Sequence, residues 1–390
     1  MQVVSVIRLA AAVAVVYWHW DCLGDWHCNM SPMESTASGT ESESLSYCRF
    51  AIDETPVCVW SYDLNGDNRR YLNAIDPDYF EKTATIVAGD GFEGSDAQTR
   101  AVAIRALYGQ ASEALLALLA ATAQAPDCVP GWMGRYQNRE LDAVIAKISR
   151  GAPLLTRFSS NVVTWESLSA FVHAGIDSKD PDFRARCIAG FARFWRRLAS
   201  EHGEPHTSRE YNAIKHGLRT RAGGFSIAIG IEETPGKACP PEKMGPHWGS
   251  PFGTSTVAPI KVDGTKRHYC FGSVANNWNP SVLALRLSLI AYGIGNVIAR
   301  LKLLAGEPPE RLVLSYPGDV KAFDEAWPER PWPLTSTFSS KIDAEDIQQL
   351  SDADILEVYQ PSGPASKPPG PTPSGPPEST PVSQRAGESR

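Results

Sequence analysis

The stretch "SDAQTRAVAIRALYGQASEALLALLAATAQAP", Ser95–Pro126, decides the fold class of this chain. Ser95 followed by Gln98 has the spacing of a capping box, in which two side chains satisfy the first free backbone groups of a helix. Residues with high helix propensity then continue without a break until Pro126. The stretch therefore predicts one long helix, and the rest of the chain is interpreted around it.

Three further segments have the spacing of helices. "RELDAVIAKI" (139–148) is short. "PDFRARCIAGFARFWRRLA" (181–199) places apolar side chains on one stripe at three- and four-residue steps. "NPSVLALRLSLIAYGIGNVIARLKLLAG" (279–306) begins with Asn279 as cap and Pro280 as first helical residue, and it ends at Gly306. The stripe of the second segment consists of Phe183, Cys187, Phe191, Phe194 and Leu198. Polar residues such as Arg286 and Asn296 interrupt the third segment, so we expect a buried-face helix and not a membrane span.

Strand signals are few. "FSIAIGI" (225–231) alternates large apolar and small residues, which predicts a strand with one buried face, and the segment around Tyr269 is its expected partner. The Gly- and Pro-rich stretch 234–256 between them is expected to be a long loop. A short strand is expected at 57–62. The fold class predicted is mainly α: a helical bundle with a small β-hairpin or sheet insertion and disordered termini.

The chain divides by composition into six segments. We expect a disordered or misassigned N-terminal extension at 1–46, a mixed segment at 47–94 and the helical bundle at 95–217. A β excursion with a long loop follows at 218–278, then a C-terminal helical segment at 279–360. The Pro-, Ser- and Gly-rich residues 361–390 cannot form a core and are expected to be a disordered tail.

The N-terminal apolar run "LAAAVAVVYW" (9–18) admits two interpretations. It has the length of a secretory signal, but only Arg8 precedes it as a positive charge, and no small-residue cleavage site follows. An upstream extension of a chain that starts at Met30 or Met33 fits better, and it favours a cytoplasmic protein without membrane association.

Metal and cofactor motifs are weak. His19, Cys22, His27 and Cys28 could surround zinc, but adjacent His27 and Cys28 suit such a site poorly. "DLNGDN" from Asp63 lacks the closing carboxylate of a calcium loop, so a solvated turn is expected. No phosphate-binding glycine loop stands between a strand and a helix. The sequence therefore predicts no metal and no cofactor.

The candidate site is in "SREYNAIKHGLRTRAGGF" (208–225). A helix capped by Thr207 or Ser208 would place Arg209, Asn212 and His216 at i, i+3 and i+7, on one face. An imidazole can move a proton at a ribose hydroxyl, a guanidinium can neutralise phosphoryl charge, and the amide can orient either group. We therefore predict catalytic roles for Arg209, Asn212 and His216, and phosphate-binding roles for Lys215, Arg219 and Arg221.

Charge patterning supports a phosphate-rich partner at this place. The whole chain has a formal net charge of −7, which argues against general nucleic-acid coating. Residues 184–221 nevertheless contain nine basic residues and three acidic ones. Two other interpretations stay open: binding without chemistry, and a purely structural use of side chains that pair internally.

"REYNAIKHGLR" resembles the signature of HEPN domains, small all-helical bundles that often act as metal-independent endoribonucleases in bacterial toxin and antiviral systems. Arg209 and His216, with six residues between them, match the looser form of the family motif. In the common form an Arg directly precedes the Asn, whereas here Tyr211 precedes Asn212. The segment is also similar to a bacterial family without an assigned function that carries Tyr-Asn-x-x-Lys-His-Gly-x-Arg followed by Gly-Gly-Phe.

The resemblance implies a helical bundle, RNA as substrate, and a site assembled across a homodimer. The departures from the motif leave an alternative, in which the chain is a non-catalytic interaction or ligand-binding protein of a bacterial stress or defence locus.

Overall fold

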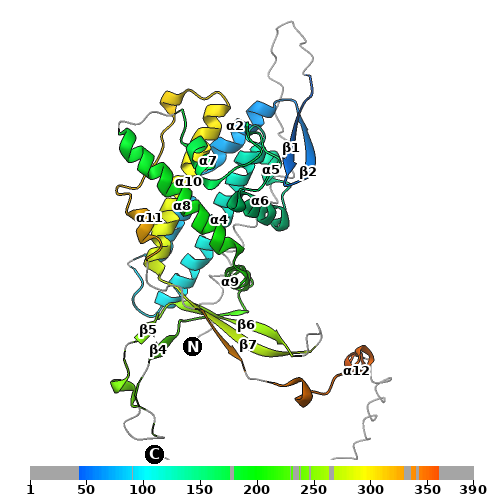
Figure 1. The fold of residues 1–390 in the computed structure, drawn as a ribbon, viewed down its shortest axis with the longest axis vertical. Helices are drawn as coiled ribbons and strands as arrows, with labels where there is room; N and C mark the ends of the chain where they lie inside the picture. Colours follow the sequence, from blue (N-terminus) through cyan, green and yellow to red (C-terminus); the bar gives the residue numbers. More distant parts are fainter. Residues whose placement is uncertain are drawn as a thin grey trace, which may run out of the picture. The chain divides into compact units, whose positions relative to one another are not determined.

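The computed structural model describes residues 44–89, 91–175, 180–228, 230–231, 237, 239–245, 247–262, 268–328, 335–339 and 342–359. These residues are mainly helical, with small antiparallel sheets (Figure 1), which confirms that the fold is mainly α. The expected disordered termini and the alternative zinc ligands from His19 to Cys28 lie outside the described residues.

The long helix α4 (Ala97–Gln124) forms the centre of the helical core. Its start differs from the prediction. Asp96 is the N-cap without a side-chain cap hydrogen bond, and Gln98 donates instead to the carbonyl of Pro251, 3.5 Å away, in the β region. The capping box therefore does not form, because a tertiary contact engages its second member.

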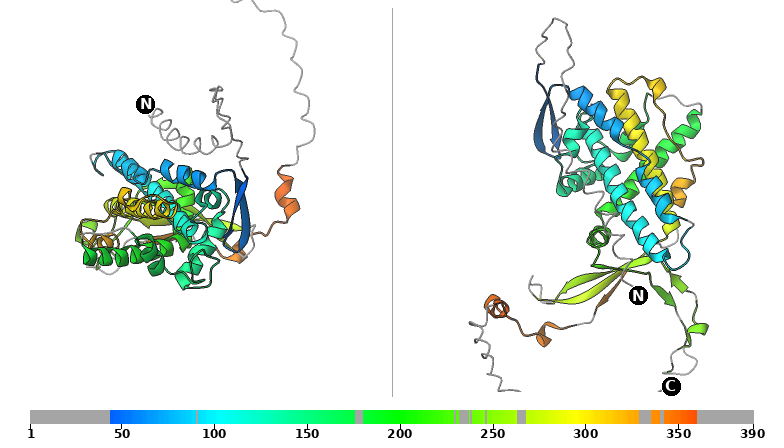
Figure 2. Two further views of the ribbon diagram at one scale, coloured as in Figure 1. Left: turned by 90° about the horizontal axis from the view of Figure 1, so that it is seen from above. Right: turned by 180° about the vertical axis from the view of Figure 1, so that it is seen from behind.

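Helix α10 (Pro280–Leu304) packs along α4 (Figure 2), in agreement with the buried-face helix expected for this segment. Asn279 caps it by accepting from the backbone of Ser281 and Val282. Gly293 lies where a methyl group would reach Leu115 of α4 at 3.2 Å, so the missing side chain lets the two helices approach closely. Both α4 and α10 are long and apolar enough to cross a membrane, but 50% and 67% of their most apolar windows are buried inside the fold. Packing accounts for their composition.

Shorter helices complete the core. Helix α8 (Pro181–Gly203) buries the predicted stripe except for Phe183, which is half-buried. Helix α6 (Asn138–Arg150) matches its prediction closely, and Gln137 with Glu140 forms its capping box. The remaining helices that pack around these are α2 (Leu64–Ala74), α3 (Tyr79–Ala88), α5 (Val129–Met133), α7 (Trp165–Val172) and α11 (Ala322–Glu325). A last helix, α12 (Asp352–Glu357), has no buried residue.

The segment 47–94 is more regular than its mixed signals indicated. A hairpin of β1 (Ser46–Ile52) and β2 (Thr55–Ser61) contains the expected strand, and Gln124 of α4 bonds to both backbone groups of Asp53 at its turn. The solvated turn expected at Asp63 is wrong. Asp63 caps α2 by accepting from the backbone of Gly66, so its carboxylate has a structural partner.

The β region differs most from the prediction. Strand β4 (Ser226–Ala228) pairs with β5 (His247–Gly249), and not with the segment around Tyr269. That segment is β7 (Tyr269–Asn277), the third strand of an antiparallel sheet in the order β3-β6-β7-β8. Its neighbours are β6 (Gly253–Lys261) and β8 (Thr335–Ser339), and β3 (Thr220–Ala222) is the far edge. The predicted loop thus contains β5 and the start of β6, because long-range pairing formed strands that local composition did not indicate.

Helix α9 (Pro205–Lys215) joins the two parts of the fold. It contacts α4 and α8 on one side and β3 and β6 on the other. Figure 1 shows it between the helical core and the sheet. The position of α9 is what brings the site residues into place.

Candidate functional site

The predicted catalytic residues lie on the outer face of α9. The helix starts four residues earlier than expected, with Glu204 as N-cap and Pro205 in the first turn, because proline needs no amide partner there. Arg209, Asn212 and His216 are all exposed, as the shared face predicted. Among the described residues, no hydrogen bond or ion pair engages these three side chains. The interpretation that they pair internally is therefore not supported.

The outer face of α9 does not form a pocket lined by both Arg209 and His216. Asn212 and Lys215 line a small cavity of about 90 Å³, together with acidic residues of α4 and α6, but Arg209 and His216 do not line it. His216 caps the C-terminus of α9, so it is separated from Arg209 by seven residues, or about 10 Å along the axis.

Basic residues extend this outer face beyond the helix. Lys215, Arg219 and Arg221 are exposed, and Arg221 belongs to the edge strand β3. The arginines of α8 behave differently: Arg193 and Arg196 pair with Asp324 and Glu166, which lie far away in the sequence. The local excess of basic residues in the sequence is therefore partly neutralised in the fold, and the basic residues without an ion pair include those on the outer face of α9 and β3.

The inner face of α9 carries Glu210, which was not among the predicted site residues. The residue is 1% exposed. One carboxylate oxygen accepts from Arg105 Nε and Nη2 at 3.1 and 2.6 Å, and the other accepts from Trp278 Nε1 at 3.0 Å and from the hydroxyl of Thr254. Four donors from α4, β6 and the segment before α10 thus meet on one buried carboxylate.

Burial and charge act in opposite directions on the Arg105 guanidinium. Burial alone lowers its pKa, but the Glu210 carboxylate outweighs that effect, so the pKa lies above its usual value. The Arg105 guanidinium therefore stays charged beside the Glu210 carboxylate.

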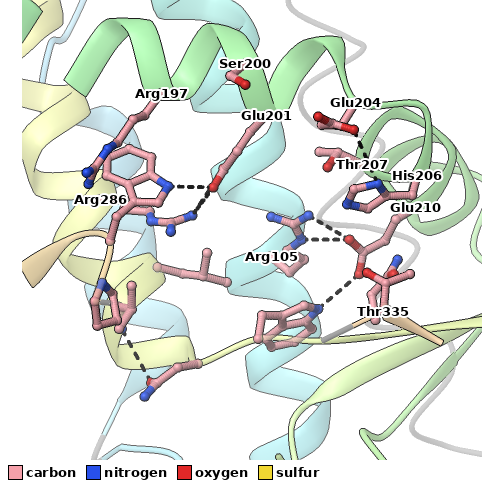
Figure 3. A pocket seen from close by; sticks show the side chains of 17 residues that line it. Arg105, Arg197, Ser200, Glu201, Glu204, His206, Thr207, Glu210, Arg286 and Thr335 are labelled. Atoms are coloured by element: carbon pink, nitrogen blue, oxygen red, sulfur yellow. Dashed lines mark hydrogen bonds and ion pairs between the residues drawn. The ribbon is translucent and has the colours of Figure 1, made fainter. Parts of the chain in front are cut away.

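A second carboxylate network lies beside the first (Figure 3). Glu201 of α8 accepts from Arg286 Nη1 at 2.9 Å, from the hydroxyl of Tyr108, and from Trp327 Nε1 at 2.7 Å. Burial by itself raises the pKa of Glu201, but Arg286 and these hydrogen bonds lower it further than burial raises it. Burial and the neighbouring Glu201 carboxylate raise the pKa of Tyr108, which therefore stays a hydrogen-bond donor.

The two networks form part of the wall of one pocket of about 540 Å³, a volume typical of sites for small molecules. Figure 3 shows Arg105 with Glu210 and Arg286 with Glu201 facing this space, with Arg197 and His206 also labelled around it. Its lining is shared by α4, α8, α9, β7, β8 and α10: Arg105, Arg197, Ser200, Glu201, Glu204, His206, Thr207, Glu210, Asn276, Trp278, Asn279, Val282, Leu283, Arg286, Trp327, Pro328 and Thr335.

One buried polar side chain of the pocket has no hydrogen-bond partner among the described residues. Asn276 is 3% exposed, and neither its amide nitrogen nor its carbonyl oxygen makes a hydrogen bond. A buried polar group left unsatisfied costs about 1–3 kcal/mol. The adjacent Asn277 is fully engaged, since it exchanges hydrogen bonds of 2.9 and 2.6 Å with the backbone of Phe225. Successive strand residues face opposite sides, so only Asn276 is directed to the pocket side.

Among the residues that the structure describes, no group of three or more His, Cys, Asp or Glu side chains is arranged to hold a metal ion. The carboxylates of Glu210 and Glu201 accept hydrogen bonds from arginine, tyrosine, threonine and tryptophan donors.

Sequence reasoning missed the pocket, although part of its signal was visible. Arg286 interrupts an apolar helix, and Arg105 does the same in α4. A charged residue on a buried face needs a partner, which could have directed attention to Glu201 and Glu210. Nothing in the local sequence distinguished Asn276 from Asn277.

Comparisons with protein-family models, curated proteins and solved structures find no match to this chain. The function is therefore argued from the geometry and from the motif resemblance.

Proposed function

We propose that the protein binds RNA through the outer face of α9 and β3, as a HEPN-like helical bundle whose motif residues serve binding in the single chain. The observation that carries the proposal is the exposure of all six predicted residues on one continuous segment: Arg209, Asn212, Lys215, His216, Arg219 and Arg221. Free cationic and amide groups are what contacts to the phosphate backbone require.

Binding is favoured over cleavage for a physical reason. Metal-independent cleavage needs the imidazole and the guanidinium to reach one phosphodiester from defined positions. Arg209 and His216 lie two helical turns apart, and neither borders either of the two pockets described above. Cleavage would need a second surface, such as a second copy of this chain in a homodimer, to bring complementary groups to the same phosphate.

Fluorescence anisotropy with labelled single-stranded and hairpin RNA tests the proposal at about 50 and 200 mM salt. We expect affinity to fall with salt, with a logarithmic slope reduced by about 2 in the triple variant Lys215→Gln, Arg219→Gln, Arg221→Gln, since each lost contact to a single strand removes about 0.7. Arg150→Gln, an exposed arginine on α6, is the matched control and should leave the slope unchanged.

Cleavage is measured in the same samples by denaturing electrophoresis with EDTA present. Intact RNA under conditions of saturated binding supports a binding function, and cleavage that His216→Ala abolishes would replace it with the catalytic one. Absence of RNA binding at low salt, or binding indifferent to the triple variant, overturns the proposal. Either result would favour a protein partner of a stress or defence locus at this face.

A further inference from the structure

The pocket on the inner face of α9 has unused hydrogen-bond donors and one unused acceptor. Its two buried carboxylates are fully occupied, Glu210 by four donors and Glu201 by Arg286, Tyr108 and Trp327. A third carboxylate, that of Glu204, also borders the pocket; it is exposed and lies 3.8 Å from His206. The groups without a partner are guanidinium nitrogens and one buried carboxamide, and they set the chemistry of a ligand.

Three guanidinium groups contribute the spare donors. Arg105 Nη1 and Arg286 Nη2 make no hydrogen bond among the described residues. The other nitrogens of Arg105 donate to Glu210, whereas Arg286 donates to Glu201 through Nη1 and to the carbonyl of Ala326 through Nε. Arg197 makes no ion pair there, and its guanidinium lies 5.6 Å from the ring centre of Trp327. The neighbouring Arg193 and Arg196 on the same helix both pair with acids. An arginine without an ion pair beside a tryptophan ring suits an anionic group.

The carboxamide of Asn276, which has no hydrogen-bond partner, places a second requirement on the ligand. Asn276 lies between Thr254 and Thr335 in the register of β6, β7 and β8, so the three residues face the same side of the sheet. The hydroxyl of Thr254 donates to Glu210, whereas Asn276 offers a donor and an acceptor with no partner. A ligand edge that carries an acceptor beside a donor, as in an amide or a nucleobase, satisfies both atoms at once.

We infer that this pocket binds a small organic anion in which a phosphate is joined to a planar donor–acceptor edge, the chemistry of a nucleotide. Asn276 pairs with the edge, and Arg197, with the free nitrogens of Arg105 and Arg286, holds the anionic group. Two sources carry this chemistry: a free mononucleotide and the phosphorylated end of an RNA strand. The pocket is separate from the outer face of α9, so nucleotide binding in the pocket does not depend on RNA binding at the outer face.

Isothermal titration calorimetry on the full chain tests the inference with the four nucleoside 5′-monophosphates, their nucleosides and inorganic phosphate. We expect at least one monophosphate to bind at micromolar to low-millimolar concentration. Arg197→Gln should weaken that binding tenfold or more while it leaves nucleoside binding within twofold. Arg193→Gln, one turn away and outside the pocket, is the control and should change neither.

Asn276→Ala provides the decisive variant. We expect tenfold or greater loss of both monophosphate and nucleoside binding, with thermal stability equal to or above that of the wild type, because the substitution removes an unsatisfied buried group. Two results would overturn the inference. One is binding to this variant with wild-type affinity. The other is no binding of any probe to the wild type at 10 mM, about the weakest affinity worth assigning. Lower stability would show that Asn276 supports the fold and would also count against it.

The two sources are separated by competition. A 5′-phosphorylated RNA decamer that displaces the monophosphate, in the triple variant lacking the outer-face cations, identifies a strand end as the ligand. A monophosphate that the decamer does not displace identifies a free nucleotide.

Discussion

Replacing Glu210 by alanine should destabilise the protein more than any change on the outer face of α9. The carboxylate is 1% exposed and accepts from Arg105, Thr254 and Trp278, so it connects α9 to the helical core and to the sheet. The variant leaves the Arg105 guanidinium, whose side chain is 11% exposed, without a counter-charge. Removing one partner of a buried ion pair costs about 3–5 kcal/mol, which we expect as the loss in unfolding free energy.

Urea unfolding followed by tryptophan fluorescence measures that loss. Glu204→Ala is the matched control: Glu204 lies six residues earlier and is exposed, and the one ion pair of its side chain among the described residues is with His206, at 3.8 Å. An exposed pair of this kind contributes about 0–1 kcal/mol, so the control should stay within about 1 kcal/mol of the wild type.

A double variant separates charge from packing. Arg105→Met combined with Glu210→Leu removes both ions and fills the space with apolar atoms, which is often neutral in such sites. We therefore expect it to be more stable than Glu210→Ala alone. A Glu210→Ala protein within about 1 kcal/mol of the wild type would refute the conclusion that this network holds the sheet against the helices.

Two further predictions concern the helical core. Burial lowers the pKa of His173 to about 4, and the nearby Arg184 contributes to the shift, so between about 6.5 and 4 the unfolded chain binds a proton that the folded chain does not. The unfolding free energy should therefore fall as the pH drops through this range. The variant His173→Gln should show a shallower dependence of unfolding free energy on pH. An unchanged slope would contradict the conclusion that His173 causes this dependence. A methyl group at Gly190 of α8 would overlap the ring of Phe323, so Gly190→Ala should lower the unfolding free energy by about 1–3 kcal/mol. Gly203 lies on the same helix with open space around it, so Gly203→Ala should leave the unfolding free energy unchanged or raise it by up to about 1 kcal/mol in the same urea experiment. Equal effects of the two alanines would show that the contact with Phe323 does not limit packing.

The helices could be predicted because their signals are local. The apolar stripe of α8, the cap and first proline of α10, and the span of α4 each depend on residues a few positions apart, and all three agree with the structure. Exposure of Arg209, Asn212 and His216 followed from the same periodicity. The sheet could not be predicted in this way, since β7 pairs with β8 across more than 50 intervening residues, and β4 found its partner in a segment rich in glycine and proline.

The amino-acid sequence by itself determined the helical class, the boundaries of the strongest helices and the outward face of α9, because a repeat of 3.6 residues is set by the nearest neighbours along the chain. Only the tertiary structure decided that the opposite, inner face of α9 borders a pocket. Glu210, Arg105 and Trp278 are far apart in the sequence, and the free carboxamide of Asn276 becomes exceptional only when its surroundings are known. Charge pairing and burial are properties of three-dimensional packing, so a pocket built from them emerges only when the helices and the sheet have come together.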